Sequence, residues 1–308
     1  MIFAVSLIPL IGAVGVAVDF ARVNETRTAL QLAVDNSAVA GAAAAFGTST
    51  QTSASANSPS SVAQSYYSAI PLPGGATDTS AANAVSTSGT LPSPITVSVT
   101  STAVVPTTFL AIWRSQISVS ASATAVASGP ANVTGAFPFA LTKCIYDTYW
   151  SNGQPTIDPS TGQPYAITLG SSYHVTNSCT SGQWTSFMTA DNSDSNLKSL
   201  IDGANTSGSG SLSIGSSIYI VDGTKANLYS ETGSVDTGKI VLMPVSSESV
   251  MSAGSYTAVY ALAPFYVTSA AGGSSKTITG HFVSNYHSPL SGGSGGQYYG
   301  AGVVTLTQ

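Results

Sequence analysis

Charged side chains are scarce in this 308-residue chain, where Asp, Glu, Lys and Arg make up 7% of the residues, against about 25% in a typical soluble protein. Between Asp35 and Lys143 the only charged residues are Asp78 and Arg114. Cytosolic domains keep charged surfaces for solubility, whereas serine, threonine, alanine and glycine fill that place here. The composition therefore favours a secreted or assembled polypeptide. No basic stripe exists to neutralise phosphates, which argues against a nucleic-acid partner.

Cysteine and histidine are also rare, with two and three residues respectively. Cys144 and Cys179 do not have the C-x-x-C spacing, and so few histidines accompany them that the pattern argues against a zinc site. An extracytoplasmic disulfide between them is a better interpretation than two free thiols. Closing a loop of this length would stabilise the fold by roughly 3–4 kcal/mol in the chain-entropy model.

The residues that could carry catalysis or bind a metal lack the context that such chemistry needs. His174, His281 and His287 occur among many serines, but no G-x-S-x-G nucleophile elbow is present. The stretch DNSDSN, residues 191–196, offers oxygens to calcium, yet it lacks the sixth-position glycine and the final glutamate of a calcium loop. A helix N-cap is the simpler account. We therefore expect a protein that is not an enzyme and that holds no cofactor or metal.

The chain opens with eighteen residues, Met1 to Val18, that include no charge. A helix of that length extends about 27 Å, close to the ~30 Å hydrocarbon core of a bilayer. The order of a cleavable signal peptide, with a basic start and a small-residue cleavage site, is missing. The helical pattern also continues past the charges at Asp19 and Arg22, without Gly or Pro between Val16 and Val39. The pattern predicts one continuous helix over residues 1–47.

The second half of this predicted helix carries a face of small residues at three- and four-residue spacing, the pattern of one helical face. Such faces let helix backbones approach closely, so the pattern favours packing between copies of the chain. Asp19 and Arg22 could pair within the helix, pair with a neighbouring subunit, or form a solvated cluster beside the membrane. The residues expected to serve assembly are Gly12, Gly15, Asp19, Arg22, Leu30, Val34 and Gly41.

The same segment resembles the N-terminus of the TadE/TadG-like proteins of the tight-adherence (Flp) pilus. The residues that match are Gly15, Ala17, Val18, Asp19 and Phe20, then Leu30, Gln31, Ala33, Asp35 and the alanines after Ser37. The resemblance implies a pilin-like helix that resides in the inner membrane before assembly and in a filament core afterwards. One departure concerns type IV pilins, which carry a glutamate at the fifth mature position. Val5 stands there if Met1 is the first mature residue.

Residues 48–130 predict a small α+β head. A short helix is expected over residues 60–70, with Val62, Tyr66 and Ile70 on one face. Alternating apolar and polar residues at 95–105 and 115–128 predict two strands of a β-hairpin, joined through a helical turn at Pro106–Trp113.

Residues 131–308 predict an all-β, sandwich-like domain, because turn-forming residues separate short alternating runs. One helix is expected at Asp194–Ile201. Aromatic residues near the cysteines either pack around the disulfide or form an exposed sugar-binding patch: Tyr146, Tyr149, Trp150 and Trp184. The expected strands are Tyr165–Leu169, Tyr173–Asn177, Ser211–Val221, Lys239–Val245, Ser255–Thr268, Lys276–Asn285 and Gly300–Thr307.

The sequence thus predicts an α+β chain with an assembly helix (1–47), a head (48–130) and an extracellular β-rich domain (131–308). The function expected is that of a structural subunit whose helices bundle in the core of a filament of the Tad/Flp or type IV pilus kind. The alternative is a membrane-anchored minor pilin, tip adhesin or assembly factor of the TadG type. The expected partners are other copies of the chain, the assembly machinery, the inner membrane and, for an adhesin, glycans or other surfaces. The chain would move from the inner membrane to the cell surface.

Overall fold

The structure is a computed structural model, and it divides into two compact units. The first comprises Met1–Gly89, Ile95–Ala127 and Val304–Gln308, and the second comprises Thr90–Pro94 and Ser128–Val303. A long helix followed by a β-rich region confirms the α+β class. The predicted boundary between helix and head does not separate compact units, because both lie in the first unit. The residues described are 2–47, 58–79, 85–151, 153–170, 175–176, 179–204, 206, 211–223, 225–286 and 291–307, with side chains omitted for 2–12, 175–176 and 291.

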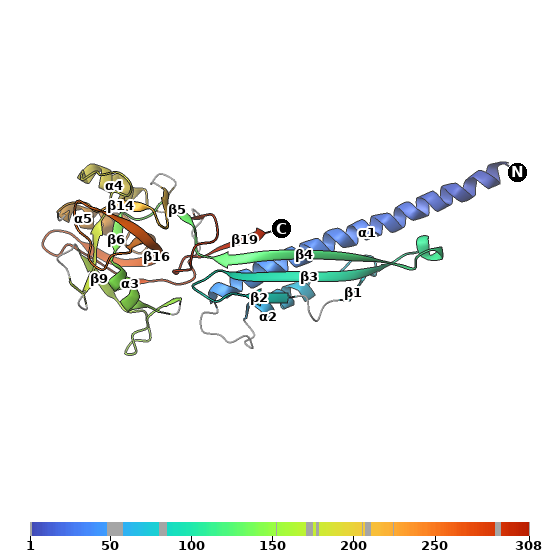
Figure 1. Ribbon diagram of the computed structural model, residues 1–308, viewed down its shortest axis with the longest axis horizontal. Coiled ribbons are helices and arrows are strands. Elements are labelled where there is room, and N and C mark those ends of the chain that lie inside the picture. Colours follow the sequence, from blue (N-terminus) through green and yellow to red (C-terminus); the bar gives the residue numbers. More distant parts are fainter. Residues whose placement is uncertain are drawn as a thin grey trace. The chain divides into compact units, whose positions relative to one another are not determined.

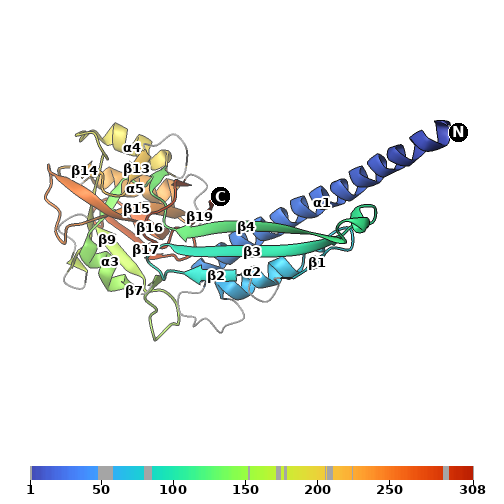
Figure 2. The same ribbon diagram turned by 45° about the vertical axis from the view of Figure 1, so that its right-hand side comes forward.

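The first unit is built on helix α1, Ile2–Ala44, which a turn of 3-10 helix, η1 (Ala45–Gly47), extends. The predicted continuous helix is therefore confirmed. Helix α2, Pro59–Ser68, begins where the Ser58 hydroxyl accepts the backbone N–H of Ser61 at 3.2 Å, with proline at the first helical position. Figures 1 and 2 show α1 running beside the strands of the head and continuing beyond the loop that joins β3 and β4.

A five-stranded antiparallel sheet packs on α1. Strands β3 (Ile95–Pro106) and β4 (Gln116–Ser128) form the predicted hairpin, paired from Ile95 with Ala127 to Pro106 with Gln116. The loop between them contains a 3-10 turn, η2 (Leu110–Ile112). Alternation turns the apolar residues of both strands toward the helix, as period-two patterning requires. The remaining strands are β1 (Thr77–Asp78) and β2 (Val85–Ser88), both on β3, and β19 (Val303–Thr307) on β4.

The outward face of the hairpin carries hydroxyls where other proteins carry charges. Ser98 and Thr124 hydrogen-bond across the strands at 3.0 Å, and Thr102 and Ser120 do so at 3.1 Å. Cross-strand hydroxyl pairs of this kind contribute to sheet stability. They show how the hydroxyl groups on this sheet surface obtain hydrogen-bond partners in a chain with so few charged residues.

Helix α2 does not bury the face expected from the sequence. Ala63 and Tyr67 are buried, whereas Tyr66 is 55% exposed, so the predicted face of Val62, Tyr66 and Ile70 was wrong. The Tyr67 hydroxyl donates to the Asp78 carboxylate at 2.6 Å, and Ala63 lies against Gly41 of α1. A close helix crossing needs a small residue, and a hydroxyl needs a polar partner when it is buried. These two requirements outweigh the apolar periodicity.

The second unit contains a seven-stranded mixed sheet in the order β12-β6-β15-β16-β17-β9, with β14 on β16. All its strand pairs are antiparallel except β15 with β6. The strands are β6 (Phe139–Leu141), β9 (Ile167–Gly170), β12 (Gly182–Trp184), β14 (Ser217–Tyr219), β15 (Ile240–Ser246), β16 (Tyr256–Ala271) and β17 (Thr277–Phe282). Smaller sheets pair β13 (Ser211–Ser213) and β18 (Ser291–Gly292) with β5 (Asn132–Thr134), β10 (Val175–Thr176) with β11 (Cys179–Thr180), and β7 (Trp150–Ser151) with β8 (Gln154–Pro155).

The second unit is β-rich but not all-β, because it also contains α3 (Lys143–Tyr149), α4 (Asp194–Asp202) and α5 (Ala226–Val235). Only α4 was predicted. The sequence of α5 includes serine, threonine and glycine, which are poor helix formers. Its buried residues Leu228, Tyr229 and Thr232 show that packing holds this helix in place.

Most of the predicted strands of this region are present, and β9, β15, β16 and β17 overlap their expected ranges. The range Ser211–Val221 is split into β13 and β14, and Gly215 in the break has a φ of +84°, a conformation that favours glycine. The range Tyr173–Asn177 falls largely outside the described residues, and Gly300–Thr307 supplies β19 of the first unit.

Candidate functional site

Asp19, in the middle of the predicted assembly helix, is buried against the loop at the end of the β3–β4 hairpin. We call this loop, residues 107–115, the tip loop. The Asp19 carboxylate accepts three backbone N–H groups, from Thr108 at 3.0 Å, Phe109 at 2.8 Å and Leu110 at 2.8 Å. The Leu110 and Thr108 bonds are the main reason that the pKa of Asp19 lies below its usual value. One carboxylate thus satisfies the donors that begin the η2 turn.

Arg22 does not pair with Asp19 in the way that their spacing suggested. Its guanidinium donates to the Thr108 hydroxyl at 3.1 Å and to the Gly74 carbonyl at 2.6 Å. The ion pairs formed within the described part of the chain are Lys143–Asp147, Lys198–Glu231 and Lys225–Asp194. The predicted i,i+3 ion pair is therefore wrong, and so is the solvated cluster, since Asp19 is buried. Both side chains tie α1 to the head of the same chain.

At two of the predicted assembly glycines, α1 closely approaches other parts of its own unit. A Cβ at Gly15 would lie 2.3 Å from the Phe109 ring. A Cβ at Gly41 would lie 2.8 Å from both the Ala63 Cβ and the Pro59 carbonyl oxygen. Glycine is required at Gly41, where a Cβ would meet the Pro59 backbone, whereas a Cβ at Gly15 would force the Phe109 ring to move. The surroundings of Gly12 lie outside the described residues.

The small-residue face predicted to bundle with other helices is occupied within the chain. Leu30 and Val34 are fully buried, and Gly41 contacts Ala63 and Val97 of the same unit. Ser37 is also buried, and its hydroxyl donates a hydrogen bond to the Ala33 carbonyl at 2.6 Å. This face packs on α2 and β3, so only the remaining faces of α1 are left uncovered by the chain.

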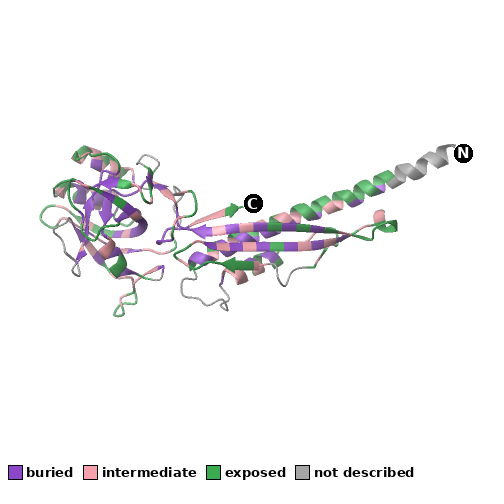
Figure 3. Ribbon diagram, viewed as in Figure 1, coloured by how far each residue is buried: buried purple, intermediate pink, exposed green. Residues whose placement is uncertain are grey.

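Those remaining faces are apolar near the start of the described side chains. Val14 is 60% exposed and Phe20 is 64% exposed, with Val16 and Val18 exposed between them. Because each residue turns by about 100°, Val14 and Val18 point roughly opposite to Val16 and Phe20. In the tip loop Phe109 is also exposed, with Ile112 at 86% and Trp113 at 79%. Figure 3 shows this exposed stretch of α1 in green.

We call these seven exposed side chains the apolar tip surface, and it is the candidate functional site of the first unit. Sequence reasoning found its helical part through the lack of charge before Asp19. It missed the contribution of the tip loop, although the run FLAIW at residues 109–113 was a visible signal. The surface consists of Val14, Val16, Val18, Phe20, Phe109, Ile112 and Trp113.

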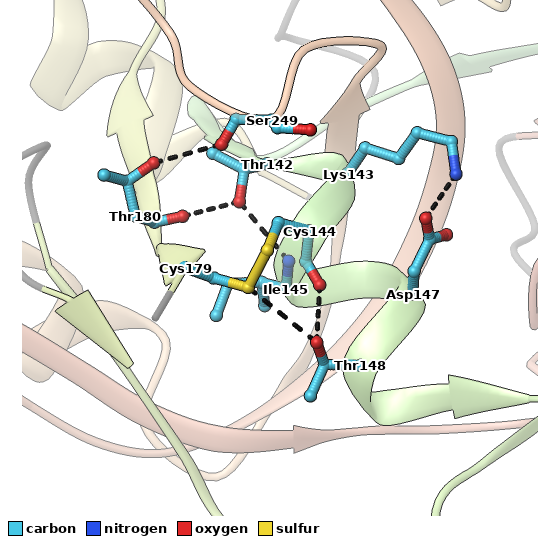
Figure 4. Close-up of a disulfide and its surroundings, with 9 residues drawn as sticks. All are labelled: Thr142, Lys143, Cys144, Ile145, Asp147, Thr148, Cys179, Thr180 and Ser249. Carbon is cyan, nitrogen blue, oxygen red and sulfur yellow. Dashed lines mark hydrogen bonds and ion pairs between the residues drawn. A yellow bond between two sulfur atoms is a disulfide. The ribbon is translucent and has the colours of Figure 1, made fainter. Parts of the chain in front are cut away.

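The predicted disulfide joins Cys144 to Cys179 in the second unit, with the Cα atoms 5.7 Å apart (Figure 4). It links the first turn of α3 to β11. Thr142 strengthens the same junction, since its hydroxyl caps α3 at the Ile145 N–H and donates to the Thr180 carbonyl. Lys143 and Asp147 form an ion pair along the exposed side of the helix. The disulfide therefore fastens α3, and with it the aromatic residues that follow.

The aromatic residues near the disulfide are buried, so the exposed sugar-binding patch considered from the sequence was wrong. Tyr146 stacks on Trp150 with ring centroids 5.8 Å apart, and both rings meet Phe282 edge-on. Trp184 is fully buried, and its ring contacts the ring of Phe139 edge-on. These aromatic pairs pack the interior of the second unit.

Of the residues weighed for catalysis or calcium binding, the structure describes His281 and the stretch at 191–196. His281 lies on β17, where burial lowers its pKa, while His174 and His287 fall outside the described residues. The Asp191 carboxylate accepts the Ser193 N–H at 2.7 Å and the Asn196 amide at 3.0 Å. Ser193 occupies the N-cap position of α4, but its side chain makes no capping bond.

From Ala13 onward, where the side chains are described, no helix is both long enough and apolar enough to cross a membrane.

Comparison with known proteins identifies the N-terminal segment. Residues 1–44 match the model of a family described as putative Flp pilus-assembly TadE/G-like proteins. No curated protein and no solved structure matches the chain. The match confirms the resemblance that was found from the residues around Asp19. It supports a role connected with the Tad pilus and a location at the cell surface or in the cell envelope.

Proposed function

We propose that this chain, with its TadE/G-like N-terminal segment, is a non-enzymatic structural subunit of an extracellular filament of the Tad/Flp type. Before assembly, the uncharged residues 1–18 hold the subunit in the inner membrane. The pilus machinery then withdraws the helix from the membrane. In the filament the N-terminal helices bundle in the core, and the β-rich second unit is exposed on the outside.

The observation that carries the proposal is the exposure of apolar residues on opposite sides of α1 between Ala13 and Phe20. A helix that is apolar all round is stable when another apolar phase surrounds it, either lipid or other helices. Only Gly15 and Asp19 are buried by the chain itself in this stretch. Covering the rest would contribute about 25 cal/mol per Å² of apolar surface.

Part of α1 is already packed within its own chain, and only the rest of the helix is available for bundling. Leu30, Val34 and Gly41 hold the helix to its own head, so contacts between copies would come from the first half of α1 and from exposed residues farther along, such as Leu32. An assembly role for Gly15, Asp19 and Arg22 would then be indirect. They set the position of the tip loop beside the helix.

Cysteine crosslinking tests this proposal, and the chain is well suited to it because both native cysteines are used in the disulfide. Val18→Cys places a thiol on the exposed side of α1, and Tyr66→Cys places one on the exposed side of α2 in the same unit. Bundled helices predict covalent dimers of the Val18→Cys chain in sheared surface filaments. The Tyr66→Cys chain should stay monomeric. Equal crosslinking of the two, or none in either, would contradict the proposal.

A minor subunit or an assembly factor is the second candidate, because the matched family is described by pilus assembly. The amount of this chain in sheared filaments separates the two. A shaft subunit should be the main component, whereas a tip protein or assembly factor should be scarce or should stay with the membrane fraction. An adhesin would need a binding surface other than the aromatic residues around the disulfide, because those are buried.

A further inference from the structure

We propose that the tip loop is a second membrane contact of this chain, which places Ile112 and Trp113 in the headgroup region of the lipid bilayer beside α1. This inference rests on the proposed function, because it requires that residues 1–18 reside in the membrane before assembly. The contact would fix the depth and the tilt of the helix, and it would have to be released when the subunit leaves the membrane.

The tip loop is held at one level of α1, meaning one position along the helix axis. Three backbone N–H groups of the loop bind the Asp19 carboxylate at 2.8–3.0 Å. Phe109 lies against Gly15, where no side chain separates the ring from the helix backbone, and Arg22 binds the Thr108 hydroxyl at 3.1 Å. The loop therefore cannot shift along the helix without breaking these contacts.

That level coincides with the end of the uncharged run. No charged residue precedes Asp19, whereas the exposed residues Glu25 and Arg27 follow about 9–12 Å farther along the helix. If residues 1–18 are in lipid, Glu25 and Arg27 are in water, and the boundary lies near Asp19. The loop bound to Asp19 is then at the interface between lipid and water.

The side chains of the loop suit an interface. Trp113 is 79% exposed and Ile112 is 86% exposed. Tryptophan concentrates at membrane interfaces because its ring is apolar and its N–H is polar. Arg114 follows directly and is exposed, with the polar residues Thr107, Thr108 and Ser115 around it. An arginine at this depth is attracted to anionic headgroups.

A lipid surface explains the exposed residues better than a second copy of the chain does. Apolar side chains are exposed on opposite sides of α1, at Val14 and Phe20, and again on the loop at Ile112. One further copy packed on this end would cover one side of the helix, and a bundle of several copies belongs to the filament, after the helix has left the membrane. A bilayer surrounds the helix and meets the loop at the same time.

Fluorescence quenching by brominated lipid tests the contact with the full chain. The protein is reconstituted in vesicles of phosphatidylcholine and phosphatidylglycerol, with and without bromine on the acyl chains near the headgroup. Trp113 is exposed, whereas Trp150 and Trp184 are buried in the second unit. The difference between the wild-type chain and Trp113→Phe isolates the signal of Trp113. We expect that signal to be blue-shifted in vesicles and quenched by the brominated lipid.

A matched pair of variants shows whether the loop causes the effect. Ile112→Asp should abolish the quenching of Trp113, whereas Ile157→Asp, at an exposed isoleucine of the second unit, should leave it unchanged. Circular dichroism confirms that both variants are folded.

The remaining outcomes separate this inference from the proposed function. A chain that does not float with the vesicles refutes membrane residence itself. A chain that floats but whose Trp113 is not quenched refutes the loop contact alone. A third outcome is that brominated lipid does not quench Trp113, while acrylamide in the aqueous phase quenches it less at high protein density than at low density. That result would mean that a second copy covers the loop, and it would overturn the inference.

Discussion

Leu30 and Leu32 lie two residues apart on α1, yet Leu30 is fully buried and Leu32 is 56% exposed. Leu30→Ala removes three buried carbon groups at about 0.8 kcal/mol each, or about 2.4 kcal/mol. The cavity left behind adds to this, so we expect the free energy of unfolding of the first unit to fall by about 2–5 kcal/mol. Leu32→Ala should change it by less than about 0.5 kcal/mol. The change in helix propensity is the same in both variants and cancels.

The assay has to report the two units separately. Far-ultraviolet circular dichroism follows the first unit, since α1 with 43 residues is much longer than any other helix described. Tryptophan fluorescence, dominated by the buried Trp150 and Trp184, follows the second unit. In detergent, Leu30→Ala should lower the Tm of the helical transition by roughly 10 °C. The fluorescence transition should stay where it is in the wild-type chain.

The pair of variants also separates folding from assembly. If α1 bundles through its exposed faces, Leu32→Ala weakens filaments while leaving the subunit stable, and Leu30→Ala acts through lost stability. Equal destabilisation by the two substitutions would refute the inference that Leu30, Val34 and Gly41 face the chain's own head. A greater loss of stability for Leu32→Ala than for Leu30→Ala would refute it as well.

Three further predictions concern single residues. Cys144→Ser opens a loop that spans a sequence separation of 35 residues and should destabilise the second unit by about 4 kcal/mol in urea unfolding, with no change in the circular dichroism transition of α1. Burial raises the pKa of Asp236 to about 6, so the folded state binds more protons than the unfolded state between about pH 4 and pH 6, and stability falls as the pH rises through that range. Asp236→Asn should remove this loss of stability, which amounts to about 1–3 kcal/mol once solvent screening is allowed for, as measured by urea unfolding at pH 4 and pH 7. Gly15→Ala should displace the Phe109 ring and free the tip loop, seen as faster proteolysis at Arg114 than in the matched variant Ala43→Ser, at an exposed site.

Local patterning was sufficient to predict helix α1 and the β3–β4 hairpin of the first unit, but not its short strands β1 and β2. Lack of glycine and proline between Val16 and Val39 predicted α1, and alternation predicted β3 and β4 nearly to the residue. Only two cysteines are present, so an oxidised chain had one intramolecular pairing available. Helix α5 was missed because its own sequence favours a loop, and packing against the sheet holds it in place.

The candidate site could be predicted only in part. The uncharged run before Asp19 marked the helix, but the tip loop joined the site through a contact between residues about ninety positions apart, Asp19 and Phe109. A carboxylate has many possible donors in a chain of this length, and periodicity cannot choose among them. The burial of Ala63 in place of Tyr66 on α2 has the same origin, since it depends on where Gly41 crosses.

By itself, the sequence determined helix α1, the two strands of the β3–β4 hairpin and the absence of charge before Asp19. Those properties depend on neighbours three or four residues away on a helix and two residues away on a strand. Only the tertiary structure decided which face of α1 is already occupied, that β19 from the end of the chain completes the first unit's sheet, and that Asp19 binds the tip loop. These outcomes depend on backbone groups and shapes brought together from distant parts of the chain. Such contacts produce no periodic pattern of residues in the sequence.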